Sequence, residues 1–371
     1  MKIGFIIIAL AILFSLNGYV MARGWQALPS VSSIRPIYLS IMIVLLLALL
    51  SGMIFSNAMP LVVAKAVSFA GFTYLIIFIY LFLSFLLVDV LRLFNLIIQI
   101  GPVYMASFRL WMMVATLGVT AIALIVGNYK FNHPQIVTLD ISTRNPTQNK
   151  ILKIVAVSDL HLGISIDKKR MQGFVKMIND QHPDIVLLAG DVSDRSMIPV
   201  IKQNMLEEFR SIKAPKGVYA INGNHEHYAE STTATADYLK KAGIIFLRDS
   251  TCLVDSSFYV VGRDDRSNIK RKTLKELVTG LDLKYPRILM DHQPYHLEEA
   301  EKNNIDLQLS GHTHNGQFFP GNLFVKGVYE LGYGYLKKGN THYYVSSGLG
   351  IWGPQYRIGT QSELVVIKLK M

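Results

Sequence analysis

Histidine, aspartate and asparagine side chains gather at five places in the second half of this chain, in patterns that suit metal coordination. Neutral imidazoles, carboxylates and an amide oxygen are ligands for borderline divalent ions such as manganese, iron or zinc. Seven candidate ligands are too many for one tetrahedral site and suit two ions that share a bridging carboxylate. The seven are Asp159, His161, Asp191, Asn224, His292, His312 and His314.

The spacing of these residues favours a shared site over separate structural roles. Asp159 and His161, like His312 and His314, are two residues apart, and extended backbone aims such side chains to one side. A single buried histidine is usually a satisfied core residue rather than a ligand. Here five of the ten histidines stand at the ends of expected strands beside Asp, Asn or Gly, so metal binding is the favoured interpretation.

Short apolar runs rich in β-branched residues lead into each of these polar clusters and predict buried strands. The runs cover residues 151–157, 184–189, 217–221, 287–290 and 305–309. Stretches with helical spacing lie between them, for example 168–181 and 198–212. Alternating strands and helices predict an α/β layered fold with its site outside the strand ends. Further strands at 341–346 and 363–370 predict a second sheet, and the loops 261–270 and 321–339 are expected to shape the pocket.

Taken together, the clusters resemble the five-block signature of the calcineurin-like metallophosphoesterases. The blocks are Asp159-Leu-His161, Gly190-Asp191-Val-Ser-Asp194, Gly223-Asn224-His225-Glu226, His292 and Gly311-His312-Thr-His314. The extension to Gln317, with Ser347-Gly-Leu-Gly350 downstream, is similar to the bacterial membrane-associated phosphodiesterase subgroup. The resemblance covers roughly residues 150–371 and implies an αββα sandwich. Glu226 stands where Asp is commoner, and Asn315 where the subgroup has Gly.

The resemblance also implies a role for each site residue. One ion would be held by Asp159, His161, Asp191 and His314, and the other by Asp191, Asn224, His292 and His312, with Asp191 bridging. Manganese is favoured, with iron or zinc as alternatives. Metal-bound hydroxide would attack the phosphorus of a phosphodiester, phosphomonoester or pyrophosphate. His225 is expected to protonate the leaving oxygen, and Asp194 either orients a ligand or caps the following helix.

The first third of the chain has a different composition from the rest. Residues 1–127 hold one acidic side chain, Asp89, and six basic ones, whereas the remainder holds 25 acidic and 31 basic side chains. The net charge of +11 therefore divides into +5 and +6. Four apolar stretches, 3–20, 37–55, 61–88 and 110–126, are each long enough to cross a membrane. A signal peptide cleaved near Ala22 is the weaker interpretation of the first stretch, because three further spans tether the chain.

These features predict a transmembrane region at 1–127, a connector with the first strand at 128–150, and a metallophosphoesterase domain at 151–371. Arg23, Arg35, Arg92 and Arg109 lie in the loops after spans one and three, against Lys2 and Lys65 on the other side. This excess of arginine predicts that the large domain lies outside the cytoplasm, although Lys130 and Arg144 after the fourth span level the count. We expect a multi-pass protein of a bacterial inner or plasma membrane. Asp89 and Arg92 are interpreted as an interfacial pair rather than as part of an ion pathway.

Several other functions are disfavoured. Cys252 is the only cysteine, which excludes an intramolecular disulfide and a thiolate-rich metal site. The chain has no zinc-finger spacing and no basic stripe interleaved with aromatics, so nucleic acid is not an expected partner. The expected partners are the bilayer and a phosphate-containing substrate, lipid-linked ones included. The alternative is a non-catalytic membrane sensor or scaffold whose phosphoesterase-like domain binds its ligand without turnover.

Overall fold

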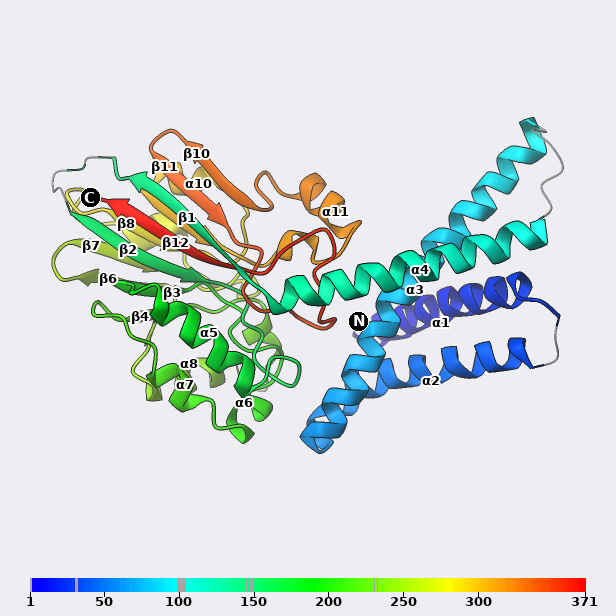
Figure 1. Ribbon diagram of the computed structural model, residues 1–371. Helices are drawn as coiled ribbons and strands as arrows, with labels where there is room; N and C mark the ends of the chain where they lie inside the picture. Colours follow the sequence, from blue (N-terminus) through cyan, green and yellow to red (C-terminus); the bar gives the residue numbers. More distant parts are fainter. Residues whose placement is uncertain are drawn as a thin grey trace. The chain divides into compact units, whose positions relative to one another are not determined.

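The computed structural model of the protein describes residues 2–30, 33–98, 105–144, 146, 150–229, 231 and 233–371 (Figure 1). The chain divides into two compact units. One comprises residues 1–126 with 353–355, and the other comprises residues 127–352 with 356–371. The first unit is helical and apolar, and the second carries both sheets and all the candidate ligands.

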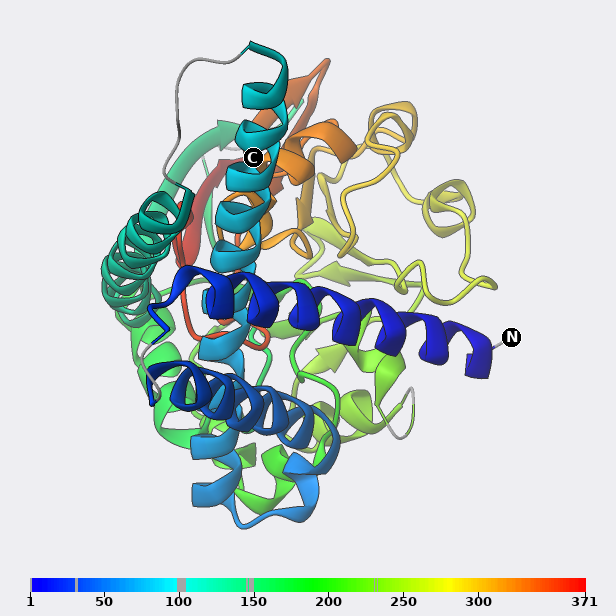
Figure 2. The same ribbon diagram turned by 90° about the vertical axis from the view of Figure 1, so that its right-hand side faces the viewer.

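Long apolar helices make up the first unit. They are α1 (Lys2–Ala27), α2 (Ile34–Phe55), α3 (Leu61–Ile98) and α4 (Met105–Asn132), with the short 3-10 helix η1 (Ser56–Ala58) after α2. By length and composition, all four long helices could cross a membrane. Within this unit α3 crosses and contacts both α1 and α2 (Figure 2). Large apolar side chains such as Val62 and Ile97 are exposed, as they are on a lipid-facing surface.

The predicted spans correspond to these helices, but each helix extends beyond its apolar stretch at one end or both. Backbone hydrogen bonding continues the helices through their polar ends, whereas the apolar run reports only the part matched to hydrocarbon. The predicted connector is wrong at its start for this reason, because residues 128–132 are the last turn of α4. Phe131 in this turn is buried in the core of the second unit. Only His133 and Pro134 separate α4 from the first strand.

Asp89 in α3 is enclosed by basic and hydroxyl groups of the same unit. Arg23 approaches it to 2.7 Å and Arg92 to 3.5 Å, and the Tyr19 hydroxyl donates a hydrogen bond of 2.8 Å. This carboxylate therefore has partners from α1 as well as the Arg92 predicted from the spacing of three residues. The arrangement agrees with an interfacial ion pair.

Two six-stranded sheets form the second unit. The first has the order β1 (Gln135–Ser142), β12 (Glu363–Lys370), β2 (Ile151–Val157), β3 (Ile185–Leu188), β4 (Val218–Ala220) and β5 (Ile245–Phe246). The second has the order β10 (Gly334–Lys338), β11 (Thr341–Val345), β9 (Leu307–Ser310), β8 (Arg287–Met290), β7 (Phe258–Gly262) and β6 (Ser250–Val254). Strands β2 to β5 are parallel, and so are β7, β8, β9 and β11. The carboxyl ends of each parallel set therefore lie along one edge of its sheet.

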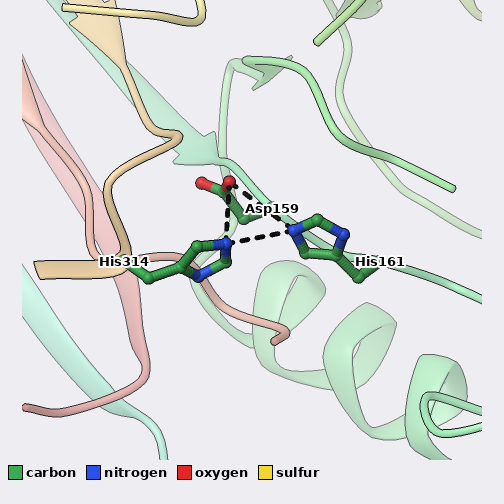
Figure 3. Close-up of side chains that lie close together, drawn as sticks. All are labelled: Asp159, His161 and His314. Atoms are coloured by element: carbon green, nitrogen blue, oxygen red, sulfur yellow. Dashed lines mark hydrogen bonds and ion pairs between the residues drawn. The ribbon is translucent and has the colours of Figure 1, made fainter. Parts of the chain in front are cut away.

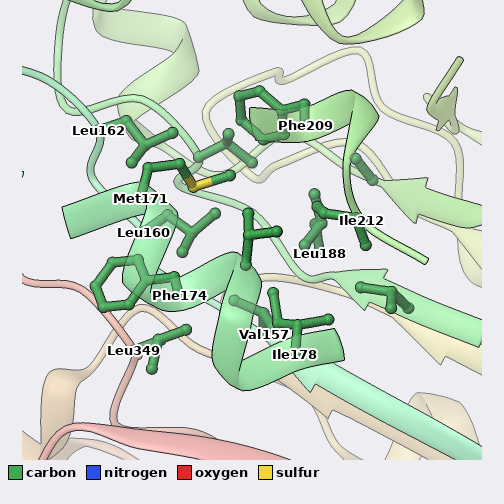
Figure 4. Packing of buried hydrophobic residues seen from close by; sticks show 14 of the residues in the cluster. Val157, Leu160, Leu162, Met171, Phe174, Ile178, Leu188, Phe209, Ile212 and Leu349 are labelled. Carbon is green, nitrogen blue, oxygen red and sulfur yellow. The ribbon is translucent and has the colours of Figure 1, made fainter. Parts of the chain in front are cut away.

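Helices cover the outer face of each sheet. The first sheet is covered by α5 (Lys168–Asp180), α6 (Ile198–Lys202), α7 (Leu206–Arg210) and α8 (Ala234–Lys241), whose apolar side chains pack on β2, β3 and β4 (Figure 4). The second is covered by α9 (Leu274–Val278) and α10 (Glu298–Lys302). The other helical elements are α11 (Gly321–Val328) and the 3-10 helices η2 (His225–Tyr228) and η3 (His314–Gly316). The predicted α/β layered sandwich is confirmed.

The alternation of side chains along β2 explains why the layers hold together. Leu152, Ile154 and Ala156 lie in the core between the two sheets, while Val155 and Val157 lie in the core under the helices. Each buried aliphatic side chain contributes about 1.5–3 kcal/mol relative to exposure. A one-residue slip would reverse both faces, so the register that places the strand end is strongly specified.

Three predicted segments differ from the structure. The stretch 198–212 is two helices, α6 and α7, because Asn204 between them has a positive φ of 49°. The loop 261–270 begins with the last two residues of β7. The loop 321–339 contains α11 and β10, neither of which was predicted; the eight residues of α11 are fewer than the about 11–18 over which helical periodicity is read.

Candidate metal centre

The candidate ligands meet because the strands before them end at the same side of the sandwich. Asp159 and His161 follow β2, Asp191 follows β3, and Asn224 and His225 follow β4. His292 follows β8, and His312 and His314 follow β9. Side chains from both sheets therefore contribute to one site, as expected for the carboxyl ends of parallel strands. The structure brings all seven predicted ligands, and also His225 and Asp194, into this region.

Asp159, His161 and His314 form the first group of potential ligands (Figure 3). One ligand atom from each lies within 4.8 Å of the others. The two imidazole Nε2 atoms are 3.1 Å apart, and Asp159 Oδ1 is 3.4 Å from His314 Nε2 and 3.7 Å from His161 Nε2. All three side chains are buried. Two imidazoles and a carboxylate that converge out of contact with solvent are a donor set suited to a divalent ion.

A second group consists of Asp191, His292 and His312, and one potential ligand atom from each again lies within 4.8 Å of the others. Asp191 Oδ2 lies 3.1 Å from His292 Nε2 and also 3.7 Å from His161 Nε2 in the first group. Asn224 joins this side, since its Oδ1 is 2.7 Å from His312 Nδ1. Asp191 thus lies between the two groups, the position that a bridging carboxylate would take.

Buried nitrogen atoms without hydrogen-bond partners point to the same conclusion. Within the described residues, His292 Nε2, which faces Asp191, is buried and makes no hydrogen bond, whereas the unpaired Nδ1 atoms of His161 and His314 lie on the ring side opposite to the Nε2 atoms of the first group. His292 Nδ1 lies 2.8 Å from the Ala189 carbonyl oxygen, and donation to it leaves Nε2 to face Asp191 Oδ2 at 3.1 Å. A buried nitrogen beside a carboxylate is satisfied either by a proton that it shares with that carboxylate or by a metal cation in its place. These residues fit two divalent ions.

Unusual backbone conformations concentrate at the ligands. A positive φ in the left-handed region costs a non-glycine residue of the order of 1–3 kcal/mol and persists only where surrounding contacts impose it. Five of the seven candidate ligands have one: Asp159 at 55°, His161 at 46°, Asp191 at 52°, His312 at 72° and His314 at 49°. The turns after β2, β3 and β9 are thus bent into strained forms that aim the side chains inward.

Glycines in neighbouring turns make room for both carboxylates. A Cβ on Gly223 would lie 2.1 Å from Asp191 Oδ1, and one on Gly311 would lie 2.2 Å from Asp159 Oδ2. Each carboxylate therefore rests directly against the backbone of another ligand-bearing turn. His225 N donates to Asp191 Oδ1 at 2.8 Å and His312 N donates to Asp159 Oδ1 at 3.1 Å. These contacts fix the carboxylates and leave oxygens directed at the histidines.

The carboxylates remain ionised in spite of their burial. Burial would raise the pKa of Asp191, but the positive charge of His292 holds it well below its usual range. Burial acts in the same direction on Asp159, and the surrounding histidines likewise hold its pKa well below normal. Negative charge is therefore present where cations are to be held.

The histidines compensate that charge to different degrees. Burial would lower the pKa of His161, but its interactions with Asp159 and Asp194 raise it to about 10. Burial dominates at His312 and lowers its pKa to about 4. Without a metal ion, a proton on His161 compensates the negative charge of the carboxylates. Binding of a metal ion by Asp159, His161 and His314 would therefore release this proton. His312 is neutral and ready to coordinate.

Asp194 lies beside two histidines rather than at a helix start. Its Oδ1 is 3.6 Å from His161 Nδ1 and 3.2 Å from His225 Nδ1, and its carbonyl oxygen also contacts His225 Nδ1. The residue that precedes α6 is Met197, without a side-chain cap, so the capping alternative is wrong. Asp194 is placed to orient both imidazole rings.

Two buried residues, to which the sequence patterns assigned no role, organise the site. Glu226 accepts hydrogen bonds from the backbone N–H groups of Asp191 at 3.1 Å, Ser193 at 2.9 Å and Gly223 at 2.7 Å, and so joins the turns after β3 and β4. Its presence in the signature was visible, but its reach across three backbone groups was not. An aspartate would be one methylene shorter.

Arg357 is the second, and it is fully buried. It donates to the carbonyl oxygens of His314 at 3.1 Å, Gly348 at 3.0 Å and Gly350 at 2.7 Å. Burial lowers its pKa to about 10, so the guanidinium stays charged at neutral pH. No local signal in the irregular segment before β12 marks this arginine, because its partners are backbone carbonyls.

A cleft of about 470 Å³ opens at the side of the second ligand group. Asn224 and His312 form one part of its wall, and Tyr228, Arg266, Ser267, Gln293 and Tyr295 form the rest. His227, which flanks the signature, faces away to Asp264, at 3.4 Å from its Oδ1. The cleft is lined mainly by polar side chains and is large enough for a small phosphate ester.

Comparison with known proteins agrees with this geometry. Residues 152–316 match the family described as calcineurin-like phosphoesterase. An uncharacterized metallophosphoesterase of Aquifex aeolicus is 30% identical over 262 residues, covering 67% of this chain and 98% of that protein. This chain belongs to the calcineurin-like metallophosphoesterase family.

Other metallophosphoesterases resemble it over a similar part of the chain. An uncharacterized member from Campylobacter jejuni is 30% identical over 254 residues, covering 66% of this chain and 65% of that protein. A protein of Danio rerio named as a transmembrane protein with a metallophosphoesterase domain is 29% identical over 262 residues, covering 64% of this chain and 57% of its own length. The chain thus spans less than two thirds of these two relatives.

The close approach of Gly223 to Asp191 generates a first prediction. In Gly223→Ala the new Cβ must displace Asp191 Oδ1 or the turn, so we expect lower stability by about 1–3 kcal/mol. We also expect metal affinity to fall by about 10–100-fold, because the carboxylate loses its position. Metal content by elemental analysis and thermal unfolding measure the two effects.

Gly173→Ala in α5 is the matched control, because a Cβ there would meet no atom within 4 Å. It should leave metal content unchanged and stability equal or slightly higher. Full metal content in Gly223→Ala would contradict the claim that contact with Gly223 fixes the position of the Asp191 carboxylate.

Proposed function

We propose that this protein is a membrane-anchored phosphohydrolase that uses two divalent metal ions to cleave a phosphodiester, phosphomonoester or pyrophosphate bond. The proposal rests above all on one observation: two groups of mostly buried ligands lie on either side of Asp191, and a cleft opens beside the second of them. A structural zinc site closes its coordination with protein atoms, whereas a catalytic pair keeps positions for substrate.

The donor set supports manganese, with iron or zinc as alternatives. It contains imidazoles, carboxylates and one amide oxygen, and it contains no thiolate, since Cys252 is the only cysteine. Bound at these ligands, the ions would supply Lewis acidity and a nucleophile derived from water at neutral pH. The chain itself contributes the buried, fixed carboxylates and the histidines that hold each ion in place.

His225 is proposed as the acid for the leaving oxygen. Its Nδ1 faces Asp194, and its ring centroid lies 4.4 Å from that of His161. Since Asp194 occupies Nδ1, Nε2 is the nitrogen available to donate a proton to substrate. Asp194 would keep that tautomer and stabilise the positive charge, as an orienting carboxylate does. His225 also lies with His161 and Asp191 in a group that could hold an ion, but Asn224 Oδ1, 2.7 Å from His312 Nδ1, would supply the neighbouring ligand and leave His225 for this role.

A lipid-linked substrate is the finer part of the proposal. The four apolar helices would hold the catalytic unit near a bilayer. In addition, α11 exposes Leu323, Phe324 and Val328 and packs against η3, the turn that begins with His314. An exposed apolar helix beside a catalytic site is suited to contact with acyl chains.

We propose that the catalytic unit lies outside the cytoplasm, in a bacterial inner or plasma membrane. In the first unit, Asp89 contacts both Arg23 and Arg92, and Gln26 contacts both Arg23 and Arg109. In chain order these arginines follow the first or the third apolar stretch, whereas Lys65 lies near the start of the third. Retention of this arginine-rich side in the cytoplasm supports the orientation.

The first test of the function is an activity screen with the purified full chain in detergent. With added manganese we expect turnover of phosphodiesters, phosphomonoesters or pyrophosphates, and Asp191→Ala should fall to the rate seen without metal. Higher turnover of lipid-linked than of soluble pyrophosphates would support the lipid assignment. Metal-loaded protein without activity on any of them would favour the sensor or scaffold alternative.

The role of His225 predicts separate effects on turnover and on metal binding. His225→Ala should lower kcat by about 10²–10⁴-fold, because the leaving oxygen must then depart without a positioned proton donor. Two metal ions per chain should remain, as measured by elemental analysis of the purified variant. Loss of one ion would instead make His225 a ligand.

Membrane orientation is testable by labelling. In a Cys252→Ser background, Ile269→Cys places a thiol at a residue of the catalytic unit that is 94% exposed. A membrane-impermeant maleimide should label this thiol in intact spheroplasts. Labelling only after lysis would place the unit in the cytoplasm.

A further inference from the structure

Arg266 is a cation of the cleft without an acidic partner. Among the described residues, no ion pair is formed by its guanidinium, whose Cζ is 4.0 Å from the centroid of the Tyr295 ring. The side chain is partly exposed and lines the same cleft as Asn224 and His312. Stacking on an aromatic face leaves the edges of a guanidinium free to donate hydrogen bonds.

The arginines near Arg266 in the sequence behave differently. Arg248 pairs with Asp264 at 2.8 Å, whereas Arg263 and Arg271 each approach Asp291 to 3.1 Å. Their charges are neutralised within the domain. Arg266 differs from them in facing the cleft, and its charge is left for a ligand.

The support under Arg266 is fixed by neighbouring contacts. The Tyr295 hydroxyl donates to the Tyr329 hydroxyl at 3.0 Å, and the Tyr329 ring lies 6.3 Å from that of His312. Gln293, adjacent to the ligand His292, donates from Nε2 to both oxygens of Asp265 at 3.0 and 2.8 Å. These contacts link the wall around Arg266 to the turns that carry the candidate ligands, so its position relative to those ligands is set by the fold.

We infer that Arg266 and Tyr295 form a subsite for a second phosphoryl group, the one that is not attacked, and that the preferred substrate is a pyrophosphate diester. This inference rests on the proposed function. A simple phosphodiester carries a single anionic group, which the ions themselves engage. A pyrophosphate carries another beside it, and a guanidinium binds such a group through two parallel hydrogen bonds.

The reaction at this site is a hydrolysis that needs no further reactant. Water adds to one phosphorus atom and the P–O–P bond breaks. The bridging oxygen departs with the second phosphoryl group, and a proton is delivered to it. Two phosphate monoesters result, and Arg266 holds the departing one.

The test compares two substrates that release the same product. One is the 4-nitrophenyl ester of thymidine 5′-monophosphate, a phosphodiester. The other is thymidine 5′-diphosphate with a 4-nitrophenyl ester on its terminal phosphate, a pyrophosphate diester. Chromatography measures the thymidine monophosphate released from each. With manganese-loaded full chain, Arg266→Ala should lower kcat/KM for the pyrophosphate by roughly tenfold or more, mainly through KM. For the phosphodiester the change should stay within about twofold, and metal content should be unchanged.

Two further variants separate local contact from general attraction. Arg266→Lys retains the charge without the planar fork and should recover only part of the loss. Lys270→Ala removes an exposed cation outside the cleft and should affect both substrates alike.

The outcomes distinguish the inference from the function beneath it. Equal losses on both substrates in Arg266→Ala, or no loss on either, would overturn the subsite while leaving the hydrolase intact. So would a parent enzyme that cleaves the phosphodiester alone. Failure of the metal-loaded parent on both substrates would remove the proposed function and the subsite together.

Discussion

The charge of two buried carboxylates is the constraint on which the rest of this structure depends. Asp159 and Asp191 are shielded from water and remain ionised, since neighbouring histidines hold the pKa of each well below normal. A buried charge without compensation would cost several kcal/mol. Cationic compensation is therefore required at this point of the fold, and it comes from protons or from metal ions. The same requirement explains why unpaired imidazole nitrogens such as His292 Nε2 are tolerated there.

Meeting this requirement imposes conditions on distant parts of the chain. Ligands from β2, β3 and β4 must meet ligands from β8 and β9, so the two sheets have to be packed in a fixed register. The apolar residues of β2 fix that register, while left-handed turns such as those at Asp159 and His312 give the final direction. Strain in the turns is offset by the cores on either side. Glu226 and Arg357 then hold the turns to one another through backbone groups.

The sequence allowed the sandwich and the ligand set to be predicted because both depend on local patterns. Strand ends are marked by β-branched runs, and ligands by residue type and spacing, as at His312 and His314. Arg357 could not be predicted, because its role depends on carbonyl groups brought together only by folding. Helix α11 was not predicted either, because its eight residues are too few for helical periodicity, which is read over about 11–18 residues.

The geometry also separates how ions are held from how a substrate is chosen. The groups that hold the ions are buried and connected by several backbone hydrogen bonds each, so substitutions there affect folding and metal binding together. Arg266 and Tyr295 belong instead to partly exposed segments around the cleft and contact the core mainly through Tyr329. Among the described residues, no hydrogen bond or ion pair joins either side chain to Asp159 or Asp191, so changes there are expected to leave those carboxylates in place. Substrate preference can therefore differ between related chains that keep the same ligands. The ligand signature indicates the chemistry, whereas the residues that line the cleft determine which substrate binds.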